Sequence, residues 1–217
     1  GPSIKNFRDP DAPSVPIVMH PDVRRMLMTI KVLAETSRSL MMRTAHRNDL
    51  VTFGDPAKRE EISNTVDLLV PILKAHCSDV AYEAATLAVQ VYGGYGYTCE
   101  YPVEQLVRDV KITSIYEGTN GIQAMDLLGR KMTMKGGALF MQWMQKVQTM
   151  LGNASQYGLE EQAGAIGKAV GHVGATAMHL SMKAMKGDLE AVMLQATPML
   201  KLFGTVQLAI EAYDQAC

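Results

Sequence analysis

Apolar residues recur at steps of three and four along most of this 217-residue chain, a spacing that predicts amphipathic helices. The first stripe runs from Val23 to Met41, and its helix is expected to begin near Pro21, because a proline is tolerated in a first helical turn. Before it, residues 1–19 form a proline-rich lead-in. The opening Gly1-Pro2-Ser3 looks like the scar of a cleaved tag.

Two further helices are predicted at about 57–77 and 79–91. Pro71 lies inside the first and is expected to bend or split it. The second is rich in alanine, whose small side chains allow a neighbouring helix to pack closely. The glycine cluster 93–96 then ends this stretch.

The rest of the chain also predicts helices. A short one is expected from Pro102 and another from near Asn120. Further helical stripes cover 139–151, 159–186 and 189–213. Pro198 is expected to kink the last of them, and the methionines, mostly at helical core spacing, are expected to serve as adaptable packing.

No convincing run of alternating polar and apolar residues predicts a strand, and no internal repeat is visible. The predicted fold class is therefore all-α. The simplest arrangement is an up-and-down four-helix bundle over residues 20–131, followed by a helical extension over residues 132–217.

Composition narrows the function classes. The net charge is −1, which gives no sign of a nucleic-acid-binding surface, and no apolar stretch approaches the ~20 residues that span a bilayer. The cysteines Cys77, Cys99 and Cys217 are odd in number and widely spaced, which favours a reducing compartment and predicts no metal site. We expect the bacterial cytoplasm, with the mitochondrial matrix as the alternative.

The segment Tyr116-Glu117-Gly118-Thr119 places a carboxylate in a tight turn between two predicted helices. Gly118 can adopt backbone angles closed to other residues, which lets a ligand approach the backbone. Thr119 or Asn120 can cap the next helix, and Asn120 with Gln123 has the spacing of a capping box. A carboxylate beside a helix amino terminus is stabilised as the anion by roughly 0.3–1 kcal/mol. Glu117 is thus a candidate general base, and the alternative is a solvated loop carboxylate.

The cluster Gly93-Gly94-Tyr95-Gly96 is not a dinucleotide-binding fingerprint, because no strand precedes it. On physical grounds it is a helix stop with room for a ligand or a partner's backbone. A plain structural turn is the alternative.

Together, residues 90–123 carry the double-glycine turn, Glu-Tyr-Pro-Val-Glu at 100–104, Arg-Asp at 108–109 and Tyr-Glu-Gly-Thr at 116–119. In this order and spacing they resemble the carboxyl-terminal signature of acyl-CoA dehydrogenases. The resemblance continues more loosely from His20 to Lys131. Residues 132–217 exceed the usual end of the family and resemble its longer members, such as 3-methylmercaptopropionyl-CoA dehydrogenase.

The resemblance implies roles for individual residues. Glu117 matches the base that removes the pro-R α-proton of an acyl-CoA thioester, while the β-hydrogen leaves as hydride to N5 of FAD. The backbone N–H of the same glutamate helps to hold the thioester carbonyl, and Gly118 matches a substrate-contacting position. The positions that match FAD-contacting stretches are Thr119, Asn120 and Gly121, and, toward the FAD of a neighbouring subunit, Gln90, Val91, Tyr92, Gly93 and Gly94. Asn120-Gly121 replaces the Ser-Gln of many members.

The same resemblance implies a homodimer or homotetramer that passes electrons from reduced FAD to an electron-transfer flavoprotein. Two alternatives remain: an acyl-CoA oxidase, which uses the same base, and a non-catalytic helical assembly module. The family also has a β-sheet domain and an amino-terminal helical domain, which this chain lacks. The isolated chain is therefore expected to be inactive.

Overall fold

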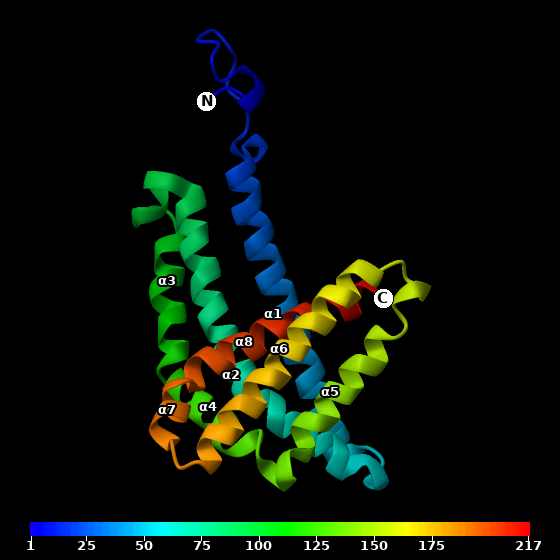
Figure 1. Cartoon of the computed structure of the whole chain (residues 1–217). Helices are drawn as coiled ribbons and strands as arrows, with labels where there is room; N and C mark the ends of the chain where they lie inside the picture. The colour runs from blue at the N-terminus through cyan, green and yellow to red at the C-terminus, as the bar shows by residue number, and fades with distance from the viewer. The chain divides into compact units, whose positions relative to one another are not determined.

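The computed structural model describes residues 1–217 and contains helices and no strand, so the predicted all-α class is confirmed (Figure 1). The chain divides into two compact units, one of residues 1–34 and 80–112, the other of residues 35–79 and 113–217. The α-helices are α1 (Pro21–Phe53), α2 (Arg59–Tyr92), α3 (Val103–Lys111), α4 (Asn120–Asp126), α5 (Ala138–Leu151), α6 (Glu160–Met185), α7 (Leu189–Leu194) and α8 (Ala196–Ala216).

Helix α2 corrects one prediction, because it runs without a break through both helices expected at 57–77 and 79–91. Pro71 lies in its interior and costs about 3 kcal/mol there. Around it Leu68, Leu69 and Ile72 are buried to 2% exposure or less, and each contributes roughly 1.5–3 kcal/mol. Core packing therefore outweighs the proline, and four α-helices, α1 to α4, remain where the bundle was expected.

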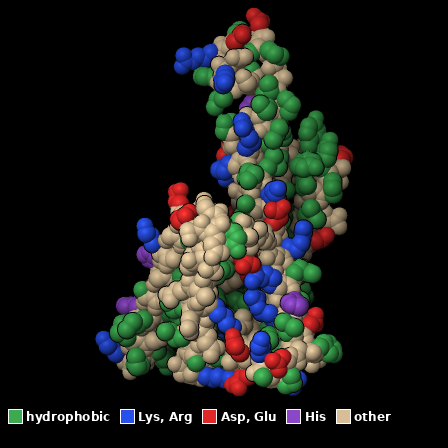
Figure 2. Space-filling view, turned by 90° about the vertical axis from the view of Figure 1, so that its right-hand side faces the viewer, with side chains coloured by type: hydrophobic (Ala, Val, Ile, Leu, Met, Phe, Trp, Pro, Cys, Tyr) green, Lys and Arg blue, Asp and Glu red, His purple; other side chains and the backbone are tan.

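The first unit contains the end of α2, the glycine-rich 3-10 turn η4 (Gly93–Tyr97) and α3. Gly93 has a φ of +62°, so the cluster ends α2 as predicted. The ring of Tyr101 packs against Tyr95, with 5.4 Å between centroids. Figure 2 shows hydrophobic side chains gathered on the surface of this unit. Its exposed apolar residues include Met28, Val32, Tyr95, Tyr97 and Leu106.

The second unit contains α4, the π-helical turn η6 (Leu127–Lys131) and the whole extension. Helix α8 packs against both α6 and α4. Phe203 on α8, Val173 on α6 and Leu127 on η6 are each fully buried. The extension therefore packs as helices against the preceding part of the chain within this unit, as its apolar stripes predict.

Pro198 does not kink the last helix. The stretch expected at 189–213 is instead two helices, α7 and α8, that meet at Gln195. Pro198 lies in the first turn of α8, where backbone N–H groups have no partner within the helix and proline is tolerated. The chain turns before the proline rather than at it.

A chain of hydrogen bonds joins α5, α8 and α1 inside the second unit. Trp143 Nε1 donates to Gln207 Oε1 at 2.9 Å, and Gln207 Nε2 donates to Glu211 Oε1 at 2.9 Å. Glu211 is 1% exposed and also accepts from Ser39 Oγ at 2.8 Å. Arg43 lies 3.6 Å from Glu211 and pairs with Asp214. A buried charge is tolerated here because its oxygens have partners.

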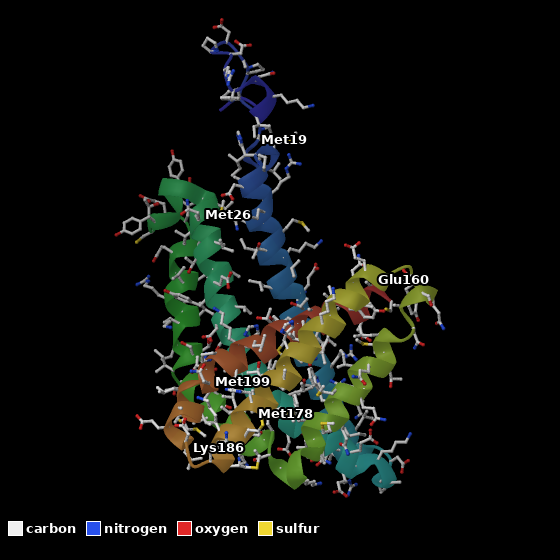
Figure 3. All side chains as sticks on the ribbon, in the orientation of Figure 1. Met19, Met26, Glu160, Met178, Lys186 and Met199 are labelled. Carbon is white, nitrogen blue, oxygen red and sulfur yellow. The ribbon has the colours of Figure 1, made fainter.

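The methionines differ from the prediction that they mostly form core packing. Met26, Met132 and Met199 are buried, whereas Met178 is 66% exposed. Figure 3 labels Met178 on α6 and Met199 on α8. Helical spacing identifies a shared face but not whether that face is covered, so periodicity alone overestimates the core.

Candidate functional site

The carboxylate singled out by the sequence lies in an irregular turn before α4. Glu117 has a φ of +51° and Gly118 a φ of +90°, so two successive residues occupy the left-handed region. Glycine adopts it freely, as predicted for Gly118, but for a glutamate it costs about 1–2 kcal/mol. Strain of this kind persists where surrounding contacts impose it, and it is common at functional sites. Glu117 itself is exposed.

Helix α4 is capped by Thr119. This residue is extended, with φ −61° and ψ 158°, and its side chain accepts a hydrogen bond from the Ile122 N–H. Asn120 is already the first helical residue. The capping box expected from Asn120 and Gln123 is therefore wrong, because a cap must precede the helix and Gln123 is one residue too far from Thr119.

The Asn120 side chain instead reaches across to α2. Its Nδ2 lies 3.0 Å from the carbonyl oxygen of Ala75, 2.8 Å from Ser78 Oγ and 2.7 Å from Asp79 Oδ1. Its Oδ1 accepts from Lys74 Nζ at 3.1 Å. Both ends of the amide are thus engaged by one helix.

Lys74 also holds the turn itself. Its Nζ donates to the carbonyl oxygen of Gly118 at 2.6 Å and lies 5.9 Å from the centre of the Tyr116 ring. Sequence reasoning missed Lys74. It lies 44 residues before Gly118, and no helical periodicity indicates which loop a half-buried lysine will meet.

The second group of predicted site residues, Gln90 to Gly94, lies at the end of α2 and the start of η4, in the first unit. Val91 is half-buried and the others are exposed. No atom lies within 4 Å of where a Cβ would stand on Gly93 or Gly94. The backbone there is open to another molecule. Glu117 to Gly121 belong to the second unit, so the predicted residues form two separate groups.

No group of three or more histidine, cysteine, aspartate or glutamate side chains is placed to hold a metal ion. None of the helices combines the length and apolar character needed to cross a bilayer. All three cysteines are free.

Two family descriptions match the sequence. Residues 3–133 match "Acyl-CoA dehydrogenase, C-terminal domain", and residues 141–217 match "Acetyl-CoA dehydrogenase C-terminal like". The 3-methylmercaptopropionyl-CoA dehydrogenase of Ruegeria pomeroyi is 37% identical over 190 residues, which cover 83% of this chain and 32% of that protein.

The broad-specificity linear acyl-CoA dehydrogenase FadE5 of Mycobacterium tuberculosis is 34% identical over 220 residues, covering 99% of this chain and 35% of that protein. The chain thus spans about a third of the length of these relatives. These matches include the extension, as its likeness to longer members predicts. Caenorhabditis elegans ACDH-11, solved in complex with C11-CoA, aligns with a TM-score of 0.70 at 20% identity, over 90% of this chain and 33% of that one. That likeness supports the helical fold alone.

Proposed function

Because this chain belongs to the acyl-CoA dehydrogenase family, we propose that it supplies the proton-abstracting part of a flavin-dependent acyl-CoA dehydrogenase. The observation that carries the proposal is the turn at Glu117. The exposed Glu117 carboxylate belongs to a family motif and its backbone stands in a conformation unusual for glutamate, while Lys74 of α2 holds the carbonyl of the next residue. We assign residues 20–131 to the bundle and residues 132–217 to its extension.

We assign the removal of the substrate's α-proton to the Glu117 carboxylate. The acid–base step requires an ionised carboxylate with a fixed position relative to the thioester. The Glu117 backbone N–H is assigned to the thioester carbonyl, where a hydrogen bond would acidify the α-carbon. Gly118 would lie against the substrate, since its lack of a side chain leaves the backbone accessible.

FAD, when bound, would accept the β-hydrogen as hydride. Thr119, Asn120 and Gly121 are assigned to hold it, and Gln90 to Gly94 are assigned to the FAD of a neighbouring subunit. The glycines among these residues leave room for the cofactor to approach the backbone closely. Gly93 and Gly94 face open space, and a Cβ on Gly121 would meet only Thr119 Oγ1, at 3.8 Å. The Asn120 amide is engaged by α2, so the contact assigned to Asn120 is made by its backbone.

We further propose a homodimer or homotetramer, in which Gln90 to Gly94 face the FAD of a neighbouring subunit, and an electron-transfer flavoprotein as electron acceptor. The open backbone at Gly93 and Gly94 supports a contact of this kind.

The test uses a full-length protein that also carries the regions its relatives have outside this match. Titration with acyl-CoA in the absence of oxygen should bleach the bound flavin. Reoxidation by an electron-transfer flavoprotein but not by oxygen identifies a dehydrogenase, and rapid reoxidation by oxygen identifies an oxidase. Flavin that stays oxidised with every acyl-CoA tested would favour an assembly module instead.

A further inference from the structure

We infer that Lys74 is the positioning residue of the Glu117 turn, contacting the residue on each side of the glutamate. The inference rests on the proposed role of Glu117 as base. Lys74 Nζ contacts the residue after Glu117, through the Gly118 carbonyl oxygen at 2.6 Å, and the residue before it, through the Tyr116 ring at 5.9 Å. One ammonium group therefore holds both neighbours of the base.

The strength of this contact comes from the charge. Hydrogen bonds with an ionised donor are shorter and roughly twice as strong as neutral ones. Glu117 and Gly118 both occupy the left-handed region, a conformation that glutamate leaves readily unless something holds it. The orientation of the Gly118 carbonyl depends on the backbone angles of the turn. A hydrogen bond from the ammonium group to this carbonyl therefore restrains those angles.

Lys74 can restrain the turn because the part of α2 that carries it is packed in the core. The next two residues along α2, Ala75 and His76, are 0% and 3% exposed, so the backbone at position 74 is anchored in the core. A second set of hydrogen bonds also joins the turn to α2. Lys74 Nζ donates to Asn120 Oδ1 at 3.1 Å, and the Asn120 amide donates back to α2 at Ala75 O and Ser78 Oγ. The turn is thus held to α2 on both sides of Thr119.

This arrangement predicts that loss of the Lys74 contact affects the rate of proton abstraction more than the binding of substrate or flavin. A displaced base slows proton abstraction even when substrate and flavin still bind, because displacement of about 1 Å can cost ~10²-fold in rate. Loss of the Lys74 contact should therefore act on the chemical step. An amine that only stabilised the fold would instead lower flavin content and thermal stability.

The experiment is rapid-mixing flavin reduction in the full-length protein, with Lys74→Met, Lys74→Arg and, as control, Lys168→Met on the exposed face of α6. Lys74→Met should lower the reduction rate constant at saturating acyl-CoA by about 10–100-fold, with the Kd for acyl-CoA within about threefold. Lys74→Arg should recover most of the rate, because a guanidinium can also donate to Gly118 O. Lys168→Met should match wild type.

Glu117→Gln, measured alongside, separates the two proposals. If Glu117→Gln loses the reaction and Lys74→Met does not, the positioning role is refuted while the base stands. If Glu117→Gln keeps the wild-type rate, the proposed function itself has failed.

A second measurement needs no flavin and uses the 217-residue chain. Amide hydrogen exchange over residues 116–122 should be faster in Lys74→Met by about tenfold or more, with α6 and α8 unchanged. Unchanged exchange at the turn would refute the inference, as would faster exchange throughout the second unit.

Discussion

Gly204 on α8 passes so close to His76 on α2 that a Cβ at position 204 would stand 2.2 Å from the imidazole Cγ. His76 is 3% exposed, so its ring lies inside the core. This contact brings together one helix from the bundle and one from the extension. It explains why a glycine, which costs about 0.5–1 kcal/mol in a helix, stands in the middle of α8.

Gly204→Ala is therefore expected to destabilise the chain by about 1–3 kcal/mol, the usual cost of overpacking a core. Urea denaturation followed by circular dichroism measures it. Gly171→Ala on α6 is the matched control. No atom lies within 4 Å of a Cβ there, so this helical substitution should stabilise by about 0.5–1 kcal/mol. Equal effects of the two substitutions would show that the helices do not meet at Gly204.

The stability of the chain should fall as the pH drops from 7 toward 5. Burial lowers the pKa of His76 below its usual value, Lys201 lowers it further, and Asp79 partly offsets both. In this window the unfolded chain binds a proton at residue 76 that the folded chain does not, so acid favours unfolding. Denaturation at pH 7.0 and pH 5.5 measures the slope, which should be smaller in His76→Gln. An identical slope would show that His76 does not carry the dependence.

Glu211→Ala should destabilise the second unit by about 1–3 kcal/mol, because it removes the acceptor of the hydrogen bonds from the buried Gln207 amide and the half-buried Ser39 hydroxyl. Trp143 provides the readout. Its ring is 6% exposed and joins the same network, so its emission should be blue-shifted in the wild type and protected from iodide. Glu161→Ala, at an exposed position of α6, is the control. Water-like Trp143 emission in the wild type would contradict the packing of α5.

The isolated chain is expected to fold but to bind FAD weakly and not to turn over acyl-CoA. The second unit has a core of its own side chains, such as Leu127, Val173 and Phe203, so this unit is expected to fold without another domain. The residues assigned to FAD offer only two short backbone segments, and the chain covers about a third of its relatives' length. Titration with FAD, followed by flavin fluorescence, tests this. Micromolar or tighter binding would show that more of the site lies in this chain than assigned.

The sequence predicts most of the helices here, because their stripes are long and regular. The sequence-based prediction fails where tertiary packing determines whether a helix breaks or where it begins. Pro71 predicts a break, but the buried side chains around it keep α2 continuous. Contacts with distant parts of the chain also determine where a loop ends and the next helix begins. Asn120 has a capping residue's chemistry, yet its amide is drawn to α2 and Thr119 takes the cap.

In the candidate site, too, the sequence predicts the features that have a local signal and misses those that depend on tertiary contacts. Glu117 is found from its motif, and the freedom of Gly118 from its residue type. The positive φ of Glu117 has no signal in its residue type, because glutamate rarely adopts it. The hydrogen bond from Lys74 has no local signal, because its donor lies on α2, 44 residues before Gly118.

The central claim is that Glu117 removes the α-proton, and the most direct test is the rate of flavin reduction in full-length Glu117→Gln. Glutamine keeps the shape of the side chain but has no basic carboxylate. The variant should bind FAD and acyl-CoA as the wild type does and lose at least ~10²–10⁴-fold in reduction rate, the share that general-base catalysis contributes. Reduction of the flavin at the wild-type rate by the same acyl-CoA would contradict the assignment.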